Sequence, residues 1–458
     1  MDYQATRKRH VEYMLGRLAD HLDRLSWSAE RLRAERTMRL RQLLTIAKER
    51  SSWHRARLAD VDTQKIDEDG LSELPTMSKS ELMEHFDAIV TDPRVNIEQV
   101  NTHINGLSTD AYFLDDLHAV ASGGSSGLRG VFVWGWDAWA TVQLTVLRCQ
   151  LADRMGDPEL CANPPVTMVV AAENATHFTS ALAQTFATDA VQMHRFPIGL
   201  ALEEIVDGLN RIDGDSLATY PSMLATLTSQ AQSGRLRIKP RRILTMAEPL
   251  LAEIRRGAEE AWQAPIANLW GTSEGGVTAV GCFKDAGMHL ADDLLIVEPV
   301  DADGEPVAPG IRSERAYLTN LFNPLLPLIR YEITDEVTLI DEPCPCGSSH
   351  RRIADIEGRQ DDVFVYLGNV VVHPHVFRSV LAREATVSEY QVHQTTAGAE
   401  ILLRAEQSVD TAAIEREITD ALGRLGCVRP LVTTRLADEL PRLDTGKLKR
   451  FVALERTP

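Results

Sequence analysis

The chain has 458 residues, of which 44% are hydrophobic and 25% are charged, as in an ordinary soluble globular protein. At roughly 100–200 residues per domain, this length predicts two or three structural units. The 48 basic and 66 acidic residues leave a net charge of −18, which argues against a nucleic acid as partner because like charges repel. A single nucleotide stays allowed, since one pocket can be locally positive.

The sequence indicates a cytoplasmic protein with no membrane partner. No apolar run approaches the roughly 18 residues that span a bilayer, and residues 1–15 lack the apolar core of a secretory signal. The six cysteines are few for this length and form no disulfide framework. We therefore expect reduced thiols or metal ligands.

The first elements are helical. Residues 1–50 predict one or two amphipathic helices packed on the main body, because apolar side chains recur there at helical spacing: Val11, Leu15, Leu18, Leu22 and Leu25. Further on, Ser78 is followed three residues later by Glu81, a capping box that predicts the start of another helix.

From residue 115 to 340, strand-like runs alternate with helical patterns. The runs are VFVW (131–134), VTMVVAA (166–172), LATY (217–220), RRILTMAE (241–248) and AYLTNL (316–321). This alternation predicts an α/β fold of mixed, largely parallel sheets covered by helices.

The pattern changes near residue 358 to a compact α+β set that opens with one strand, VFVYLGNVVV (363–372). We therefore expect an N-terminal domain of residues 1–357, with 1–50 as a helical extension, and a small mobile C-terminal domain of residues 358–458.

Residues 122–127 are rich in glycine and serine and are expected to form a loop before the run VFVW (131–134). Its backbone N–H groups and hydroxyls can surround an anion, and its members are Ser122, Gly123, Gly124, Ser125, Ser126 and Gly127. It is not a Walker A loop. Two alternatives stay open: a structural loop, and the G-x-S-x-G elbow of an α/β-hydrolase, which requires a helix directly after the serine. The strand-like run GVFVWGW (130–136) disfavours the elbow.

Six segments in a fixed order resemble the adenylate-forming superfamily, which contains acyl-CoA synthetases, the adenylation domains of peptide synthetases, and luciferases. The segments are SGGSSGLRG (122–130), AEP (247–249), WGTSE (270–274), RYEITD (330–335), GRQDD (358–362) and PRLDTGKLKR (441–450). The resemblance extends from about residue 35 to residue 450. Two further segments, LPTMSKSEL (74–82) and CPCG (344–347), resemble the phenylacetate-CoA ligase branch.

The resemblance implies an ATP site. The loop 122–127 would cover the β- and γ-phosphates, Trp270 would flank adenine, Ser273 would contact the α-phosphate, and Glu274 would bind Mg²⁺, which takes carboxylates together with phosphate oxygens. The other residues implied to bind the nucleotide are Gly271, Thr272, Ala247, Glu248, Pro249, and two that contact the ribose, Asp335 and Arg359. The family usually has lysine and proline after its loop, and Leu128 and Arg129 leave that role open.

The resemblance also implies a hinge and a catalytic lysine. Asp361 matches the residue about which the family's C-terminal domain rotates between two half-reactions. Lys447 matches the lysine that enters the active site in the first of them. Attack of a carboxylate on the α-phosphate joins two anions, so an ammonium between them would stabilise the transition state. Lys447, Glu274 and Ser273 are thus the implied catalytic residues.

Four metal-ligating side chains form a Cys-x6-His plus Cys-x-Cys set: Cys282, His289, Cys344 and Cys346. Three thiolates and an imidazole suit a closed tetrahedral zinc site of the structural kind. Reduced structural cysteines are the alternative.

An acid-binding pocket is indicated by four residues: His177, Phe178, Tyr220 and Ser222. The first two lie where the family often places an aromatic or histidine gate, and the last two resemble a segment that lines the acyl side. Ordinary packing is the alternative for each, because a single histidine or aromatic residue is usually a core residue.

The sequence therefore predicts an ATP-dependent ligase that converts a carboxylic acid, favoured to be an aryl acid, into acyl-AMP and pyrophosphate and passes the acyl group to CoA. Transfer to a carrier protein or to an amine is an alternative, as is a diazotase that activates nitrite. A hydrolase that uses Ser125, or a nucleotide-binding protein without catalysis, is disfavoured. The oligomeric state, including a homodimer, stays open.

Overall fold

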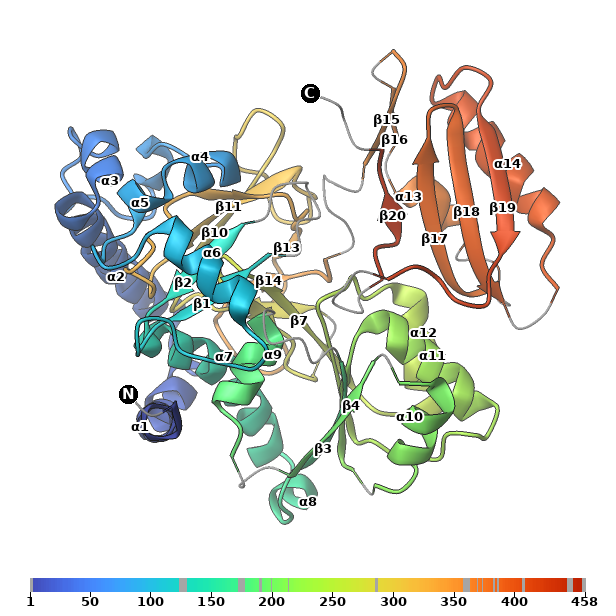
Figure 1. Ribbon diagram of the computed structural model, residues 1–458, viewed down its shortest axis with the longest axis horizontal. Helices are drawn as coiled ribbons and strands as arrows, with labels where there is room; N and C mark the ends of the chain where they lie inside the picture. Colours follow the sequence, from blue (N-terminus) through green and yellow to red (C-terminus); the bar gives the residue numbers. More distant parts are fainter. Residues whose placement is uncertain are drawn as a thin grey trace. The chain divides into compact units, whose positions relative to one another are not determined.

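The computed structural model describes residues 3–454 except for 123–129, 172–177, 189–191, 199, 213, 285–286, 357–362, 369, 373, 382–383, 385–386, 406–407 and 443–447. The chain divides into two compact units that each draw on separate stretches of sequence. The first unit comprises residues 1–165, 173–192 and 267–356, and the second comprises 166–172, 193–266 and 357–458 (Figure 1). The boundary expected at residue 358 stays a prediction.

The first unit begins with two long helices, α1 (Tyr3–Arg24) and α2 (Ala29–Arg50), as the spacing of apolar residues predicts. The predicted capping box is present at the start of α4 (Lys79–Glu84). Ser78 and Glu81 are only three positions apart, so each side chain can accept the backbone N–H of the other residue. The remaining helices are α3 (Ser52–Arg57), η1 (Leu71–Glu73), α5 (Phe86–Ile89), α6 (Ile97–Gly106), α7 (Trp136–Met155), α8 (Pro158–Cys161) and α9 (Phe178–Thr185).

The strands of the first unit pair antiparallel throughout the ladders that the structure describes. β1 (His118–Ala121) and β2 (Val131–Trp134) form a hairpin. A second group has the order β10-β11-β12 and a third the order β13-β14-β9-β8-β7. Connections as short as residues 273–275 permit only antiparallel pairing. The bounds are β7 (Ile266–Thr272), β8 (Gly276–Val280), β9 (Met288–Leu290), β10 (Leu295–Val300), β11 (Arg315–Asn320), β12 (Tyr331–Ile333), β13 (Leu339–Ile340) and β14 (Arg352–Ile353).

The second unit contains the parallel strands that the alternating pattern predicts. Its strand order is β6-β5-β3-β4, and β3, β5 and β6 pair parallel because a helix connects β5 to β6 and returns the chain to the same edge. Helices α10, α11 and α12 lie beside these strands (Figure 1) and share one apolar core with them. The bounds are β3 (Val166–Ala171), β4 (Gln192–Pro197), α10 (Leu202–Leu209), β5 (Ser216–Thr219), α11 (Pro221–Gln232), β6 (Arg242–Met246) and α12 (Ala252–Trp262).

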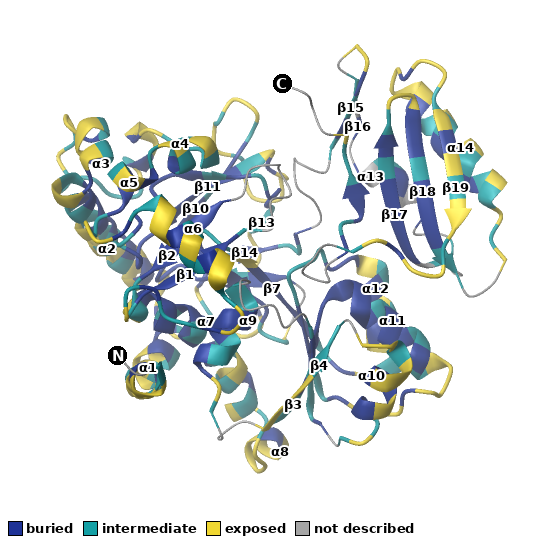
Figure 2. Cartoon of the chain, viewed as in Figure 1, coloured by how far each residue is buried: buried dark blue, intermediate teal, exposed yellow. Residues whose placement is uncertain are grey.

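The C-terminal part of the second unit has a four-stranded sheet in the order β19-β18-β17-β20. Its central strands β17 and β18 are largely buried, whereas the edge strand β19 is mostly exposed (Figure 2). The run at 363–372 is a hairpin rather than the single strand expected, because Gly368 adopts φ of +84° and turns the chain. The bounds are β15 (Phe364–Tyr366), β16 (Val370–Val372), α13 (His375–Leu381), β17 (Val387–Thr395), β18 (Gly398–Ala405), α14 (Thr411–Arg424), β19 (Leu431–Leu436) and β20 (Phe451–Val452).

The predicted mixed α/β class is confirmed. Among the helices that the structure describes, none is long and apolar enough to cross a membrane.

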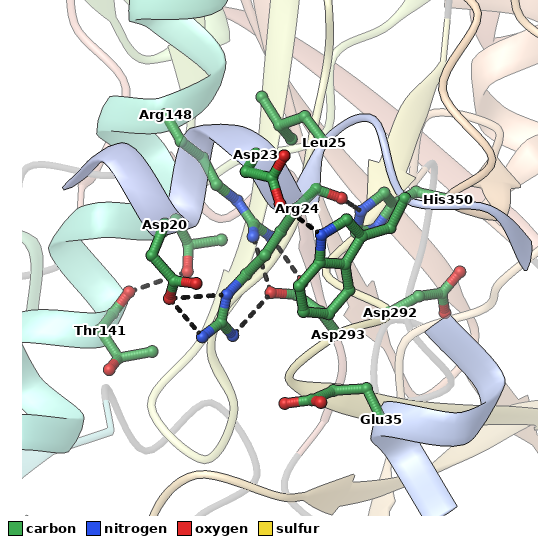
Figure 3. Close-up of polar contacts among 12 residues, drawn as sticks. Asp20, Asp23, Arg24, Leu25, Glu35, Thr141, Arg148, Asp292, Asp293 and His350 are labelled. Atoms are coloured by element: carbon green, nitrogen blue, oxygen red, sulfur yellow. Dashed lines mark hydrogen bonds and ion pairs between the residues drawn. The ribbon is translucent and has the colours of Figure 1, made fainter. Parts of the chain in front are cut away.

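Two adjacent aspartates in the first unit hold several of its elements together. Asp293 is fully buried and accepts two hydrogen bonds of 2.8 Å from Arg148 of α7 and one of 3.3 Å from Arg24 of α1 (Figure 3). Asp292 accepts the backbone N–H of Arg351 at 2.6 Å and the guanidinium of the same residue at 2.8 and 3.0 Å. The turn between β9 and β10 thereby fixes α1, α7 and the segment before β14.

A fourth arginine extends this network to α2. Arg36 donates to the backbone carbonyl of Asp292 at 3.2 Å and pairs with Glu68 at 2.6 Å. Burial raises the pKa of Asp293, but the charge and hydrogen bonds of Arg148 outweigh burial, so the pKa of Asp293 lies well below its usual value. The carboxylate is therefore charged in the folded protein.

Asp293→Asn should destabilise the first unit by about 3–5 kcal/mol, because it leaves the buried guanidinium of Arg148 without its carboxylate and removes one of the two carboxylates that pair with Arg24. Urea unfolding followed by tryptophan fluorescence measures this, since every tryptophan except Trp262 lies in the first unit. The pKa of Asp293 is lower in the folded protein than its unfolded value of about 4. The stability that Asp293 contributes is therefore fully present above about pH 4 and is lost as the pH falls toward the folded-state pKa.

The matched control is Asp69→Asn, which removes the exposed partner of Arg33. It should leave the unfolding midpoint almost unchanged, because exposed ion pairs contribute little. Equal midpoints for the two variants would contradict the role given to Asp293.

Candidate functional site

The glycine and serine loop closes the β1–β2 hairpin. At its described base, Ser122 donates its N–H to Gly130 O at 2.8 Å, and the Gly130 N–H donates to Ser122 Oγ at 2.9 Å. Residues 123–129 lie outside the described residues. A strand, β2, follows the loop, whereas a nucleophile elbow requires a helix directly after the serine. The hydrolase alternative therefore lacks its structural context.

The WGTSE segment spans the end of β7 and the turn into β8. Trp270 is buried on β7, and a register shift lies between it and Gly271. Thr272 Oγ1 accepts the N–H of Gly275 at 2.9 Å and so closes the turn. Ser273 and Glu274 are partly buried within this turn, which presents a hydroxyl and a carboxylate on adjacent residues.

Two residues that sequence reasoning missed lie against Glu274. Asn320, at the end of β11, donates its side-chain amide to the backbone carbonyl of Glu274 at 3.2 Å. The buried hydroxyl of Tyr331 has no hydrogen-bond partner of standard geometry among the described residues, yet it is close enough to Glu274 to be affected by its charge. Burial, and then the charge of Glu274, raise the pKa of Tyr331. Tyr331 belongs to RYEITD, in which the resemblance implies a role for the aspartate alone.

Asp335 closes the RYEITD segment just after β12. Its side chain is buried, which is unusual for an aspartate and indicates a structural or binding role. The chain next to it is fixed by Val337, whose N–H donates to Ser313 Oγ at 2.9 Å.

In the second unit, the AEP loop follows β6 and meets the start of α11. Ala247 has φ of +70°, an uncommon conformation for a residue other than glycine. The carboxylate of Glu248 accepts the Ser222 N–H at 2.9 Å and the Ser222 hydroxyl at 3.0 Å. Glu248 therefore caps the first turn of α11, where unpaired N–H groups favour an anion.

The three predicted acid-pocket residues that the structure describes take part in packing. Tyr220 and Ser222 are buried at the start of α11. Phe178 opens α9, and its ring centroid lies 5.7 Å from that of Trp134 and 5.0 Å from that of Trp139. His177 lies outside the described residues.

The four predicted zinc ligands converge. Their ligand atoms all lie within 4.8 Å of one another, although the residues come from three separate segments of the first unit. Cys282 Sγ is 3.5 Å from Cys344 Sγ, and Cys346 Sγ is 3.3 Å from His289 Nε2. His289 Nδ1 lies 3.2 Å from the carbonyl oxygen of His350, a hydrogen bond that directs Nε2 toward the three sulfur atoms.

Several predicted site residues fall outside the part of the chain that the structure describes. Besides the loop residues and His177, they are Arg359, Asp361 and Lys447. Their roles stay predictions.

No protein-family model matches the chain. A curated phenylacetate-coenzyme A ligase from Thermus thermophilus is 25% identical over 463 aligned positions, which cover 93% of this chain and 97% of that protein. Another from Pseudomonas putida is 24% identical but covers 47% of this chain and 50% of its own length.

Solved structures show the same fold. A 2-hydroxyisobutyryl-CoA ligase in complex with 2-HIB-AMP aligns with a TM-score of 0.72 at 19% identity, over 94% of this chain and 91% of that chain. An anthranilate CoA ligase in complex with anthranoyl-AMP aligns with a TM-score of 0.51 at 17% identity, over 73% of this chain and 66% of that chain.

These comparisons confirm the predicted resemblance, because the fold is that of the adenylate-forming ligases. Within that superfamily, the curated relatives that the chain matches are phenylacetate-coenzyme A ligases. Nothing in the comparisons supports the diazotase, the carrier-protein ligase or the hydrolase.

Proposed function

We propose that this chain is an AMP-forming acid-CoA ligase, which uses ATP to join a carboxylic acid to the thiol of CoA through an acyl-AMP. The observation that carries the proposal is the match to a phenylacetate-coenzyme A ligase along 93% of this chain. The order of the six motifs along the chain also supports it, because all six serve one reaction in the superfamily that they resemble.

In the first half-reaction, a carboxylate oxygen attacks the α-phosphorus of ATP, an O–P bond forms, and pyrophosphate leaves. We assign Glu274 to Mg²⁺, which offsets the charge of the phosphates, and Ser273 to the α-phosphate. Trp270, the AEP loop and Asp335 are assigned to the nucleoside. Lys447 is assigned to the two reacting anions, where a positive charge stabilises the transition state.

In the second half-reaction, the CoA thiolate attacks the carbonyl carbon of the acyl-AMP, a C–S bond forms, and AMP leaves with the former carboxylate oxygen. Activation makes this step favourable, because AMP is a far better leaving group than hydroxide. Asp361 is assigned to the hinge between the two steps. We propose an aryl acid as substrate, since the matched relatives act on phenylacetate by name.

We further propose that the cluster of three cysteines and His289 binds a structural Zn²⁺. Three sulfur ligands and one imidazole are the donors that Zn²⁺ prefers, and four protein ligands leave no open position for catalysis. The positive φ of Gly347, at +81°, supports the tight turn that lets Cys344 and Cys346 serve one ion. The ion would join the loop after β13 to β9.

The assignment as a ligase is tested by the release of AMP and pyrophosphate from ATP with phenylacetate, benzoate and a fatty acid, each with and without CoA. The proposal predicts equal amounts of AMP and thioester with at least one acid when CoA is present. Release of ADP, or no nucleotide turnover with any acid under these conditions, would contradict it.

Lys447→Ala should lower the rate of acid-dependent exchange between pyrophosphate and ATP by about 100- to 1,000-fold, because the transition state loses a positive charge. The control is Lys239→Ala, which removes an exposed lysine of the same unit and should leave the exchange unchanged. An unchanged rate in the Lys447 variant would remove Lys447 from the mechanism.

Zinc analysis of the purified protein should find about one Zn²⁺ per chain. Cys344→Ser should lose the ion and melt at a lower temperature, and a chelator should lower the melting temperature of the wild type. Cys161→Ser, which alters an exposed cysteine of α8, should do neither. Protein that is free of zinc and melts unchanged in chelator would overturn the metal site.

A further inference from the structure

Tyr331 of β12 carries a hydroxyl that is buried in the first unit. Its side chain is 1% exposed, and among the described residues the hydroxyl has no hydrogen-bond partner of standard geometry. A buried hydroxyl without a partner is unfavourable, because it has lost its hydrogen bonds to water. Such a group in a folded protein requires an explanation, and a role at a functional site is one of the few that apply.

The backbone on both sides of Tyr331 is fixed by a single residue, Met77. The N–H of Met77 donates to the carbonyl of Arg330 at 3.1 Å, and the carbonyl of Met77 accepts the N–H of Glu332 at 2.9 Å. The Tyr331 ring packs against the ring of Phe132, with the centroids 6.4 Å apart. The position of the hydroxyl is therefore determined by the strand and by the packing of the ring.

Arg330, directly before Tyr331, is held in an uncommon conformation. Its φ is +47°, a value that a residue other than glycine keeps only where the surroundings enforce it. Here its guanidinium donates to the carbonyls of Ser72 at 2.9 Å and Leu74 at 2.7 Å, and it pairs with Glu298 at 3.2 Å. Strained backbone of this kind is concentrated at functional sites, and the side chain that it places here is Tyr331.

The turn that carries Glu274 packs against the strand that pairs with Tyr331. Leu318 of β11 is the register partner of Tyr331, and its Cδ2 lies 2.8 Å from the position that a Cβ on Gly275 would take. Further along β11, the side-chain amide of Asn320 donates to the backbone carbonyl of Glu274 at 3.2 Å. Strand β11 thereby brings Glu274 and Tyr331 together, although they are far apart in sequence.

The two side chains are also close enough to interact electrostatically. Burial, and then the charge of Glu274, raise the pKa of Tyr331, so the hydroxyl keeps its proton and can donate it to a carboxylate. A carboxylate that accepts a hydrogen bond from a fixed neighbour is held in one orientation. Such neighbours of metal ligands strongly influence how tightly the metal is bound.

We propose that Tyr331 is a positioning residue, whose hydroxyl donates to the Glu274 carboxylate and holds it in the orientation that binds Mg²⁺ together with ATP. This inference rests on the proposed function, which assigns Glu274 to that ion. Tyr331 acts through Glu274 and touches no reacting atom. Asn320 fixes the backbone of Glu274, and Tyr331 fixes its side chain.

The test compares ATP binding by Tyr331→Phe and the wild type in isothermal titration calorimetry, with no acid present. Phenylalanine keeps the ring and removes only the hydroxyl. With excess Mg²⁺, the variant should bind ATP about 10- to 100-fold more weakly, as when a hydrogen-bonding partner of a metal ligand is lost. With EDTA in place of Mg²⁺, both proteins should bind ATP equally. In the pyrophosphate exchange assay, the KM for ATP should rise by the same factor, and the KM for the acid should stay within about twofold.

Glu274→Ala shows whether Tyr331 acts through the glutamate. In that background, Tyr331→Phe should weaken the binding of ATP with Mg²⁺ no further, because the group that the hydroxyl positions is already absent. A further loss as large as that in the wild type would overturn the inference.

The matched control is Tyr317→Phe, the same substitution on β11. Tyr317 directly precedes Leu318, so its ring lies on the other face of the strand, and its loss of a hydroxyl should change neither affinity. If Tyr331→Phe weakens ATP binding equally with and without Mg²⁺ and melts at a lower temperature, the hydroxyl serves packing alone and the inference is overturned. Unchanged binding in Tyr331→Phe would overturn it as well.

The binding measurement separates this inference from the assignment as a ligase, because it needs neither acid nor CoA. If Tyr331→Phe shows the loss that depends on Mg²⁺ but no acid elicits AMP, the ligase assignment fails and the role of Tyr331 stands. If AMP forms but the affinity of Tyr331→Phe for ATP with Mg²⁺ equals that of the wild type, the ligase assignment stands and the role of Tyr331 fails.

Discussion

The buried pair Asp292 and Asp293 is the constraint on which the first unit depends most. These adjacent carboxylates pair with arginines from α1, α2, α7 and the segment before β14. Paired charges of this kind contribute little net stability compared with apolar packing, but they are very unfavourable when one partner is missing. The main effect of these ion pairs is therefore to determine which helices pack at the turn after β9. Their net contribution to the stability of the unit is smaller.

That turn also adjoins the Cys and His cluster. His289 lies on β9, three residues before Asp292, and its Nδ1 faces the carbonyl of His350. The ring nitrogens of His350 in turn lie 3.0 Å from the carbonyl of Leu290 and 3.1 Å from that of Arg24, and Figure 3 shows His350 beside Arg24. The ion-pair network and the cluster thus hold the same loop from two sides, and α1 is attached to both.

Features that short, chemically specific patterns mark could be predicted, and those that depend on distant contacts without such a pattern could not. The capping box at Ser78 and the convergence of the Cys and His residues follow from short, chemically specific patterns. The hairpin at 363–372 was missed because a continuous apolar run conceals a turn that only Gly368 marks. Tyr331 was missed because Glu274, the residue that it lies against, is 57 positions away in the chain. No periodicity records such contacts.

The central claim is that an acyl-AMP lies between ATP and the thioester, and an isotope transfer tests it most directly. The ligase is supplied with ATP, CoA and the active acid labelled with ¹⁸O in both carboxylate oxygens, and the products are analysed by mass spectrometry. The account predicts one ¹⁸O atom in each AMP and none in pyrophosphate, because the attacking oxygen stays on the α-phosphorus. Unlabelled AMP, or label in inorganic phosphate, would contradict it.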